Sequence, residues 1–303
     1  MARSITMVLA WLMVNLALAN GPDSAPAPGG KQAALSAAQI VRKNVDARGG
    51  QDAWRKILTM VWTGHIEPGN GALPSLPYVL DMKRPDKTHF EINAHGQIIA
   101  RTFDGLHGWK LKPMPNGRPL LEPYSARELS FARDVHGIGW PLMENRVKDT
   151  AIKLEGTDDI EGHQAYCLSI SRPSGYKMQV WIDAASFLDI KTARESRNAS
   201  GNTVKVSMYY RDYKAVDGVK LPFMIESTNE SGITIDKMVI DHVALNAPLD
   251  DRVFGRPTLS LLGNPSARET SNSRRVDFRT AYPMMRAAAP SGSPFSLAPS
   301  HGH

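Results

Sequence analysis

Apolar and polar residues alternate over much of this chain, and the clearest stretch is Thr203–Tyr213. An apolar side chain stands there at nearly every second position, which is the period of a β-strand with one apolar face. Asp217-Gly218 follows, a dipeptide suited to a type I′ turn because both central residues of that turn need a positive φ. Leu221–Ile225 then forms a second apolar run. The pattern predicts a long hairpin in which Tyr210 lies opposite Ile225.

The same period recurs on both sides of this hairpin. It predicts about twelve strands, namely Met60–Ile66, Tyr78–Lys83, Lys87–Ile92, Gln97–Phe103, Gly108–Lys112, Ala151–Glu155, Ala165–Ser171, Lys177–Ile182, Leu188–Ala193, Thr203–Tyr213, Leu221–Ser227 and Thr234–Val243. Most connections are too short for a crossover helix, so the sheet should be antiparallel and should curl into a barrel or part of one. Asp212 is costly to bury on an apolar face, and we expect it at a rim or on a bulge.

Three segments have helical character instead. Apolar residues in Ser36–Arg48 fall near one face of a helix, and Gly49-Gly50 ends it. Gln51–Ile57 is expected to form a second, short helix. A third helix should start at the capping box Ser125-Ala-Arg-Glu128 and end near Asp134, because serine and glutamate at this spacing satisfy the first free N–H groups of a helix.

The two ends of the chain differ in composition from its middle. Arg3 precedes a short apolar run, Ile5–Leu18, and Ala17-Leu18-Ala19 has the small residues of a cleavage site, so residues 1–19 are predicted to be a secretory signal peptide. A membrane anchor is the alternative, and the short run argues against it. Residues 20–34 have the composition of a linker and residues 35–256 that of the folded domain. The segment 257–303 lacks periodicity and should be mostly disordered.

Composition and motifs limit the chemistry that the chain can carry. The formal net charge of +6 comes partly from the tail and indicates mild attraction to anionic surfaces, not a nucleic-acid groove. The single cysteine, Cys167, excludes an internal disulfide and a cysteine-pair zinc or redox site. Gly-x-Ser-x-Gly and phosphate-binding glycine loops are absent, and only His301 and His303 have a metal-ligand spacing. We therefore predict no catalytic residue, no cofactor and no metal site.

Large apolar side chains on the predicted strands remain the strongest feature. They are the candidate ligand-binding residues Trp62, Tyr78, Leu80, Phe90, Ile92, Trp109, Leu111, Val180, Ile182, Met208, Tyr210, Phe223 and Ile225. Such residues can fill an ordinary core, or they can line a cavity, since larger curved sheets enclose space that side chains do not fill. Periodicity does not distinguish the two, and both alternatives stay open at this point.

Several short motifs between Ser36 and Pro257 occur in the order and spacing of a known family. They are the segment IVRKNVDARGGQDAW, Phe103-Asp-Gly105 with Gly108-Trp109, Trp181-Ile-Asp183 before Leu188, Tyr210-Arg-Asp-Tyr213, Val216-Asp-Gly-Val-Lys-Leu-Pro222, Leu245-Asn, and Leu249-Asp-Asp-Arg-Val-Phe254. In these motifs the chain resembles the periplasmic outer-membrane lipoprotein-sorting family of LolA and LolB. The resemblance implies an unclosed β-half-barrel with a few helices at its mouth, an apolar cavity for acyl chains, and no catalysis.

The resemblance has limits that shape the functional hypothesis. The tail beyond Pro257 is not part of the pattern, and the N-terminal cysteine of a membrane-anchored receptor of the LolB kind is missing. We therefore expect a soluble, monomeric periplasmic carrier of lipid or lipoprotein acyl chains, with donor and acceptor proteins at the inner or outer membrane and no nucleic-acid partner. One rival is a lipid-sensing regulatory protein of the same fold. Another is a hydrolase of apolar esters, for which no nucleophile motif is present.

Export is the first testable prediction. Cleavage after Ala19 should leave a soluble chain, because the apolar run Ile5–Leu18 is too short to span a bilayer. N-terminal sequencing of the protein from the periplasmic fraction checks this. A chain that retains Met1, or that stays in the membrane fraction, contradicts it.

Overall fold

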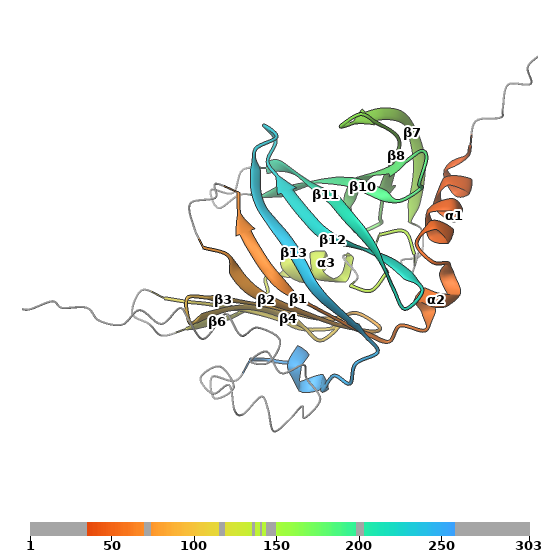
Figure 1. The fold of residues 1–303 in the computed structure, drawn as a ribbon. Coiled ribbons are helices and arrows are strands. Elements are labelled where there is room, and N and C mark those ends of the chain that lie inside the picture. Colours follow the sequence, from red (N-terminus) through yellow and green to blue (C-terminus); the bar gives the residue numbers. More distant parts are fainter. Residues whose placement is uncertain are drawn as a thin grey trace, which may run out of the picture. The chain divides into compact units, whose positions relative to one another are not determined.

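The computed structural model describes residues 35–69, 74–114, 119–134, 137–139, 141–143, 150–197 and 203–257 (Figure 1). The chain divides into the units Met1–Leu35 and Ser36–His303, and the description below concerns the second unit. The predicted signal peptide, the linker, the tail from residue 258 and the pair His301 and His303 lie outside the described residues. Among the described helices, none has the length and hydropathy needed to cross a bilayer.

All described strands belong to one antiparallel sheet of thirteen strands. The strands are β1 (Thr59–Pro68), β2 (Leu76–Lys83), β3 (Lys87–Ala94), β4 (Gln97–Phe103), β5 (Gly108–Lys112), β6 (Leu120–Pro123), β7 (Ala151–Ile160), β8 (His163–Ser171), β9 (Lys177–Asp183), β10 (Asp189–Arg197), β11 (Thr203–Val216), β12 (Val219–Thr228) and β13 (Thr234–Leu245).

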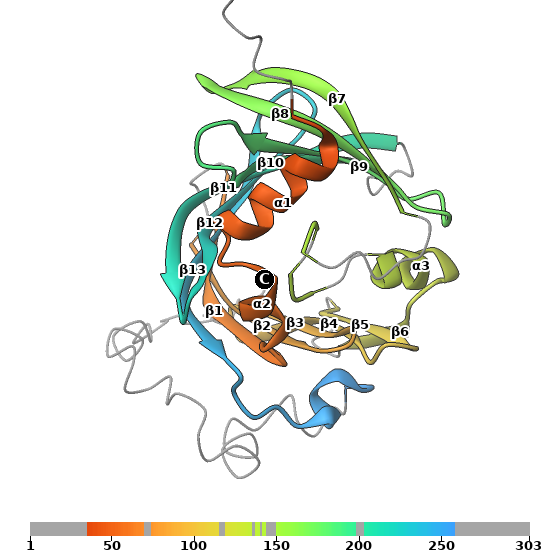
Figure 2. The same ribbon diagram turned by 90° about the vertical axis from the view of Figure 1, so that its right-hand side faces the viewer.

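The sheet is not closed into a barrel. Its order is β6-β5-β4-β3-β2-β1-β13-β12-β11-β10-β9-β8-β7, so β6 and β7 are the two edges and are not paired with each other. Neighbours in the sheet are neighbours in sequence except at β1, which pairs with β13. Figure 2 shows the sheet curling around the helices. The mainly β, antiparallel, unclosed half-barrel predicted from the sequence is confirmed.

The long hairpin follows its sequence pattern closely. Asp217 and Gly218 both have a positive φ, at 45° and 87°, as a type I′ turn requires, and Tyr210 pairs with Ile225 as predicted. Asp212 also has a positive φ, and its exposed carboxylate binds Lys214, so it avoids burial as expected. One strand, β6, was not predicted, because it is short and ends at a proline that reads as a loop residue.

The helices are α1 (Ala37–Ala47), α2 (Gln51–Arg55), α3 (Ala126–Asp134) and the 3-10 helix η1 (Asp251–Phe254). The capping box predicted at Ser125 and Glu128 forms at the start of α3, and the structure shows a second one, not predicted, in which Ser36 and Gln39 cap α1. The three predicted helices are therefore confirmed, and α3 lies in the connection between the two edge strands.

The corner between α1 and α2 is fixed to one end of the sheet. A Cβ at Gly49, which has a φ of 110°, would lie 2.3 Å from the carbonyl oxygen of Gly218, so only glycine allows this backbone approach. The buried guanidinium of Arg48 binds the buried carboxylate of Asp189 at 3.1 Å, and the carboxylate also accepts a hydrogen bond from Asn44. The guanidinium of Arg48 lies over the ring of Trp54, and the indole N–H of Trp54 donates to the carbonyl oxygen of Arg48. These contacts fix the first two helices to the turns after β9 and β11.

The segment after β13 covers part of the face of the sheet that points away from α2 and α3. Helix η1 lies against β3 and β4 on the side away from α2 and α3 (Figure 2). Lys83 and Lys87 both bind the carboxylate of Asp251, and the ring of Phe254 is fully buried. This segment thus closes the outer surface of the N-terminal half of the sheet.

Phe254 provides a test of that closure. Phe254→Ala should lower the free energy of unfolding by about 3–5 kcal/mol, because it removes a fully buried ring and leaves a void. Chemical denaturation measures the change. Val253→Ala, in the same turn but only half-buried, is the matched control and should cost about 1 kcal/mol or less. Equal losses in the two variants would contradict a specific role for the phenylalanine.

Candidate functional site

One face of the sheet, here called the inner face, carries Met60 on β1 and packs against the helices. Met60 belongs to a buried apolar cluster with Trp54 of α2, Met82 of β2, and Ile138 and Met143 from the connection that follows α3. Figure 2 shows α2 and α3 on the inside of the curl. Side chains alternate between the two faces of a strand, so the pairing register assigns every other strand residue to the inner face or to the outer face.

The middle of the inner face is a continuous apolar surface. Directly paired residues follow one another across the strands, and two rows are formed by Phe90, Leu80, Trp62 and Val243, and by Ile66, Met238, Ile225 and Tyr210. Paired side chains on one face lie close enough to touch. Gly64 of β1 stands between Tyr78 and Ile240 in a third row and adds no side chain there. The inner face therefore offers apolar contact area that spans six strands.

Eleven of the thirteen candidate residues lie on this inner face, by the strand register. They are Trp62, Tyr78, Leu80, Phe90, Ile92, Val180, Ile182, Met208, Tyr210, Phe223 and Ile225. Of these, Tyr78, Val180 and Ile182 are fully buried, and the other eight are half-buried. The half of the sheet around β8 and β9 is thus filled, whereas the region from β3 to β11 keeps partly accessible apolar side chains.

Trp109 and Leu111 were wrongly assigned to the shared face. Trp109 pairs with Thr102 and Leu111 with Ala100, while the inner-face Phe90 pairs with Arg101, so both residues of β5 point outward. Alternation shows which residues of one strand share a face, but not which face of the neighbouring strand they join. Leu111 is buried on the outer side of the sheet, the side that η1 covers, which explains an apolar residue there.

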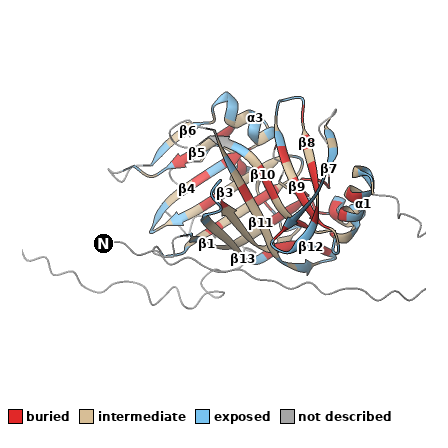
Figure 3. Cartoon of the chain, turned by 90° about the horizontal axis from the view of Figure 1, so that it is seen from above, coloured by how far each residue is buried: buried red, intermediate tan, exposed pale blue. Residues whose placement is uncertain are grey.

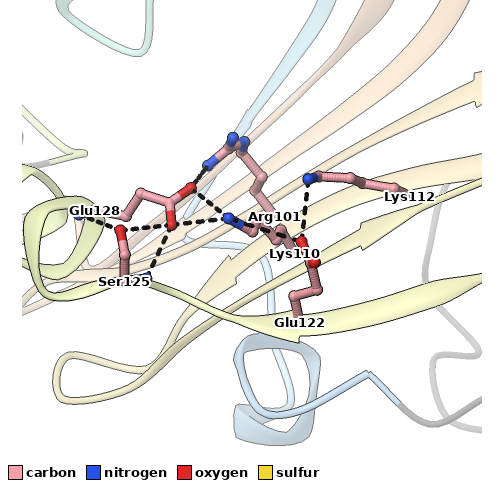
Figure 4. A network of polar contacts seen from close by, with 6 residues as sticks. All are labelled: Arg101, Lys110, Lys112, Glu122, Ser125 and Glu128. Atoms are coloured by element: carbon pink, nitrogen blue, oxygen red, sulfur yellow. Dashed lines mark hydrogen bonds and ion pairs between the residues drawn. The ribbon is translucent and has the colours of Figure 1, made fainter. Parts of the chain in front are cut away.

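Helix α3 connects the two open edges of the sheet (Figure 2). At its start, Glu128 binds Lys110 of β5 and Arg101 of β4 (Figure 4). At its end, Arg172, which follows β8, donates to the carbonyl oxygen of Asp134 and forms an ion pair with its carboxylate. We call this helix, with these contacts, the strap.

Aromatic contacts add to the second attachment of the strap. Phe131 of α3 has its ring 6.2 Å from that of Tyr176 and lies under the guanidinium of Arg194, 4.7 Å from the ring centroid. Arg194 is on the inner face of β10, because it pairs with Met178 and Val206. A cation over an aromatic face contributes roughly 0.5–2 kcal/mol, depending on exposure. The capping box predicted this helix, but sequence reasoning did not identify its partners on distant strands.

The carboxylate of Glu128 is held by several donors at once. Its two oxygens lie 2.9 and 3.0 Å from Lys110 Nζ, and the backbone N–H and the hydroxyl of Ser125 also donate to it (Figure 4). Burial acts to raise the pKa of Glu128, but the hydrogen bonds from Ser125 and Lys110 outweigh it and lower the pKa to about 2. The strap therefore carries its negative charge at any physiological pH.

A second polar cluster lies on the outer face. His89 of β3 is mostly buried between Asp81, at 2.9 Å from Nδ1, and Glu91, at 3.5 Å from Nε2. Burial alone would lower the pKa of His89, but the hydrogen bonds to both carboxylates and their charges outweigh it and raise the pKa. Within the described residues, no group of three or more histidine, cysteine or acidic side chains is arranged to hold a metal ion. The cluster acts as an ion-pair link between β2 and β3.

The filled region around β8 and β9 differs in burial from the neighbouring edge strand, β7. Strand β7 is mostly exposed, whereas β8 and β9 carry most of the buried positions in this half of the sheet (Figure 3). The thiol of Cys167 on β8 is buried, and burial raises its pKa to about 11, so it stays protonated and poorly reactive. Cys167 pairs with Trp181 and therefore lies on the outer face, whereas the inner face is distinguished by its apolar area and the strap.

A family model described as an uncharacterized protein matches residues 142–260, which is less than half of the chain. Among curated proteins, none matches. Solved structures of similar fold include a LolA superfamily protein from Nitrosomonas europaea, with 18% identity and a TM-score of 0.47, covering 73% of this chain and 98% of that one.

Two further solved structures are similar to this chain. A putative outer membrane lipoprotein-sorting protein domain from Vibrio parahaemolyticus has 13% identity and a TM-score of 0.49, and covers 74% of this chain and 97% of that one. A DUF1329 family protein from Desulfovibrio piger has 14% identity, a TM-score of 0.48, and coverages of 74% and 99%. At identities of 13–18% and TM-scores below 0.5, function must be argued from the residues of this chain.

The His89 cluster gives a prediction for pH dependence. Because the folded-state pKa of His89 is raised, its charged form stabilises the fold fully below about pH 6.5, the ordinary value, and this contribution is lost as the pH rises through the folded-state value. The melting temperature of the wild type should exceed that of His89→Gln at low pH, and the gap should narrow above about pH 6.5. His242→Gln, at an exposed position, is the control. A gap that widens with pH would show that the cluster favours a neutral histidine.

Proposed function

We propose that this protein is a periplasmic carrier that binds the acyl chains of a lipid or lipoprotein on the inner face, beneath the strap. One observation carries the proposal: half-buried apolar side chains form continuous rows across β3, β2, β1, β13 and β12 and reach Tyr210 on β11. Partly accessible apolar side chains that gather over several strands are candidates for a binding surface. Catalysis is not part of the proposal.

An acyl chain is apolar like this surface, and it requires an apolar host when it is in water. Each methylene group that leaves water contributes about 0.8 kcal/mol, so a lipid anchor free in water requires a host that covers most of its length. Leucine, isoleucine and phenylalanine in these rows provide such cover without polar groups, and the hydroxyl of Tyr210 has a partner in Thr192. The half-buried state of Trp62, Leu80, Phe90 and Ile225 means that an incoming chain gains contact area without first unfolding the core.

The open sheet and the strap suit a carrier that must also release its cargo. A closed barrel of fixed size would bind and retain a chain, whereas a sheet with two free edges is held together at its opening by the side chains of α3. Breaking the partly exposed polar contacts of Glu128 costs little compared with unfolding strands. Two states of similar free energy, with the strap attached or detached, would let the same surface take up and release a chain.

The test compares two neighbouring residues that point to opposite faces. Ile225→Glu places a charge in the middle of the inner apolar row, and it should reduce binding of the neutral fluorescent probe N-phenyl-1-naphthylamine by more than about tenfold. Since Ile225 is half-buried, water can reach the carboxylate, and the free energy of unfolding should fall by only about 1–2 kcal/mol. Fluorescence titration and thermal melting are measured on the same samples.

Met224→Glu is the matched control. Met224 is also half-buried, lies on the outer face, and pairs directly with Arg211, which would accept the new carboxylate as a cross-strand partner. This variant should bind the probe like the wild type. A wild type that binds no probe, or an Ile225→Glu chain that is unfolded while Met224→Glu is folded, would indicate a filled core and refute the carrier proposal.

A further inference from the structure

We propose that Arg101 and Lys110 form a site for the anionic headgroup of the cargo, and that Glu128 of the strap occupies this site when no cargo is bound. The proposal rests on the proposed function and names the class of ligand: an amphiphile with a phosphate, carboxylate or similar anion next to its acyl chain. The internal carboxylate stands where the headgroup oxygens would lie.

The position of the two cations relative to the apolar rows supports this assignment. Arg101 of β4 pairs directly with Phe90 of β3, and Phe90 begins the row that continues through Leu80 and Trp62. Lys110 of β5 pairs with Arg101 and is therefore on the same inner face. A ligand chain along this row would place its polar end at β4 and β5, where the apolar surface ends and the cations begin.

The donors around Glu128 have the geometry of an anion site. Lys110 Nζ contacts both carboxylate oxygens, and Arg101 Nη1 lies 3.4 Å from one of them (Figure 4). The side chain of Lys110 is only 17% exposed, and its ammonium group lies 2.9 Å from Glu128 and 3.8 Å from Glu122. Replacing Glu128 by a ligand anion keeps two anions beside Lys110, whereas moving the strap away with nothing in its place would leave only the more distant Glu122.

The balance of charges in this network also favours an anionic headgroup. The network of Figure 4 contains the cations Arg101, Lys110 and Lys112 against the carboxylates Glu122 and Glu128. When Glu128 leaves, three cations face one carboxylate, and an incoming anion restores the balance. A neutral headgroup cannot do so. Cargo binding and strap release are thereby coupled for anionic amphiphiles, because each state supplies the anion that the cations require.

The experiment measures competition against a neutral probe. The purified protein is loaded with N-phenyl-1-naphthylamine and titrated with dodecyl phosphate or with dodecyl maltoside, two amphiphiles with the same chain. The wild type should release the probe at about tenfold lower concentration of the phosphate, a factor that one charge-assisted contact can supply. Inorganic phosphate at the same concentrations should release none. Equal competition by the two amphiphiles, or release by inorganic phosphate alone, would overturn the proposal.

Three variants separate a headgroup site from a merely structural tether. Arg101→Gln and Lys110→Met should each bring the two amphiphiles to near-equal potency, and the exposed Arg101 provides a reading even if Lys110→Met weakens the strap. Glu128→Gln should bind dodecyl phosphate more tightly than the wild type, because no carboxylate competes, with dodecyl maltoside little changed. If Glu128 were only a tether, its loss would change both amphiphiles equally.

Lys112→Met is the matched control, since Lys112 lies on the same strand and face but binds Glu122 and not Glu128. It should keep the preference for the phosphate, and a loss as large as that in Lys110→Met would overturn the assignment.

Failure of the carrier proposal would give a different result from failure of the headgroup site. In that case no probe binds to the wild type, whereas failure of the headgroup site alone leaves probe binding, and its loss in Ile225→Glu, intact.

Discussion

An antiparallel sheet that does not close on itself must cover one apolar face and manage two free edges. In this chain the constraint is severe, because thirteen strands share one inner face and only three α-helices are described beside it. The cover is uneven as a result. The region of β8 and β9 is filled, with Leu168, Val180 and Ile182 fully buried, while the region around β1 keeps half-buried side chains. This unevenness is the basis on which we propose a binding surface and not an ordinary core.

The contacts at the α1–α2 corner differ in kind from those that α3 makes at the opening between β6 and β7. At the α1–α2 corner, contacts are buried and backbone-dominated: Gly49 lies against Gly218, and Arg48 and Asp189 pair out of water. Breaking such a pair by removing one partner is strongly destabilising, by about 3–5 kcal/mol. At the opening between β6 and β7, by contrast, side chains of one nine-residue helix make the connection. The corner is therefore expected to stay fixed in any state in which the strap moves.

Local patterns predicted most of the fold, and the failures share one cause. Alternation located the strands, the Asp217-Gly218 turn set the register of the long hairpin, and the capping box at Ser125 located the start of α3. Each of these signals acts within a few residues. The face of β5, and hence the placement of Trp109 and Leu111, depends on pairing with β4. Likewise the contacts of Asp134 with Arg172 and of Phe131 with Arg194 join segments about 40 to 60 residues apart, which no local period encodes.

The two attachments of the strap should respond differently to salt. The side chains of Glu128 and Arg101 are 25% and 52% exposed, whereas those of Asp134 and Arg172 are 9% and 4% exposed. Mobile ions screen exposed pairs strongly and buried pairs much less. Rising ionic strength would thus loosen the N-terminal end of α3 first and leave Phe131 and Asp134 in place. The helix would then rotate about its C-terminal end. Its contacts on the β4–β6 side would be lost, and those on the β8–β10 side would remain.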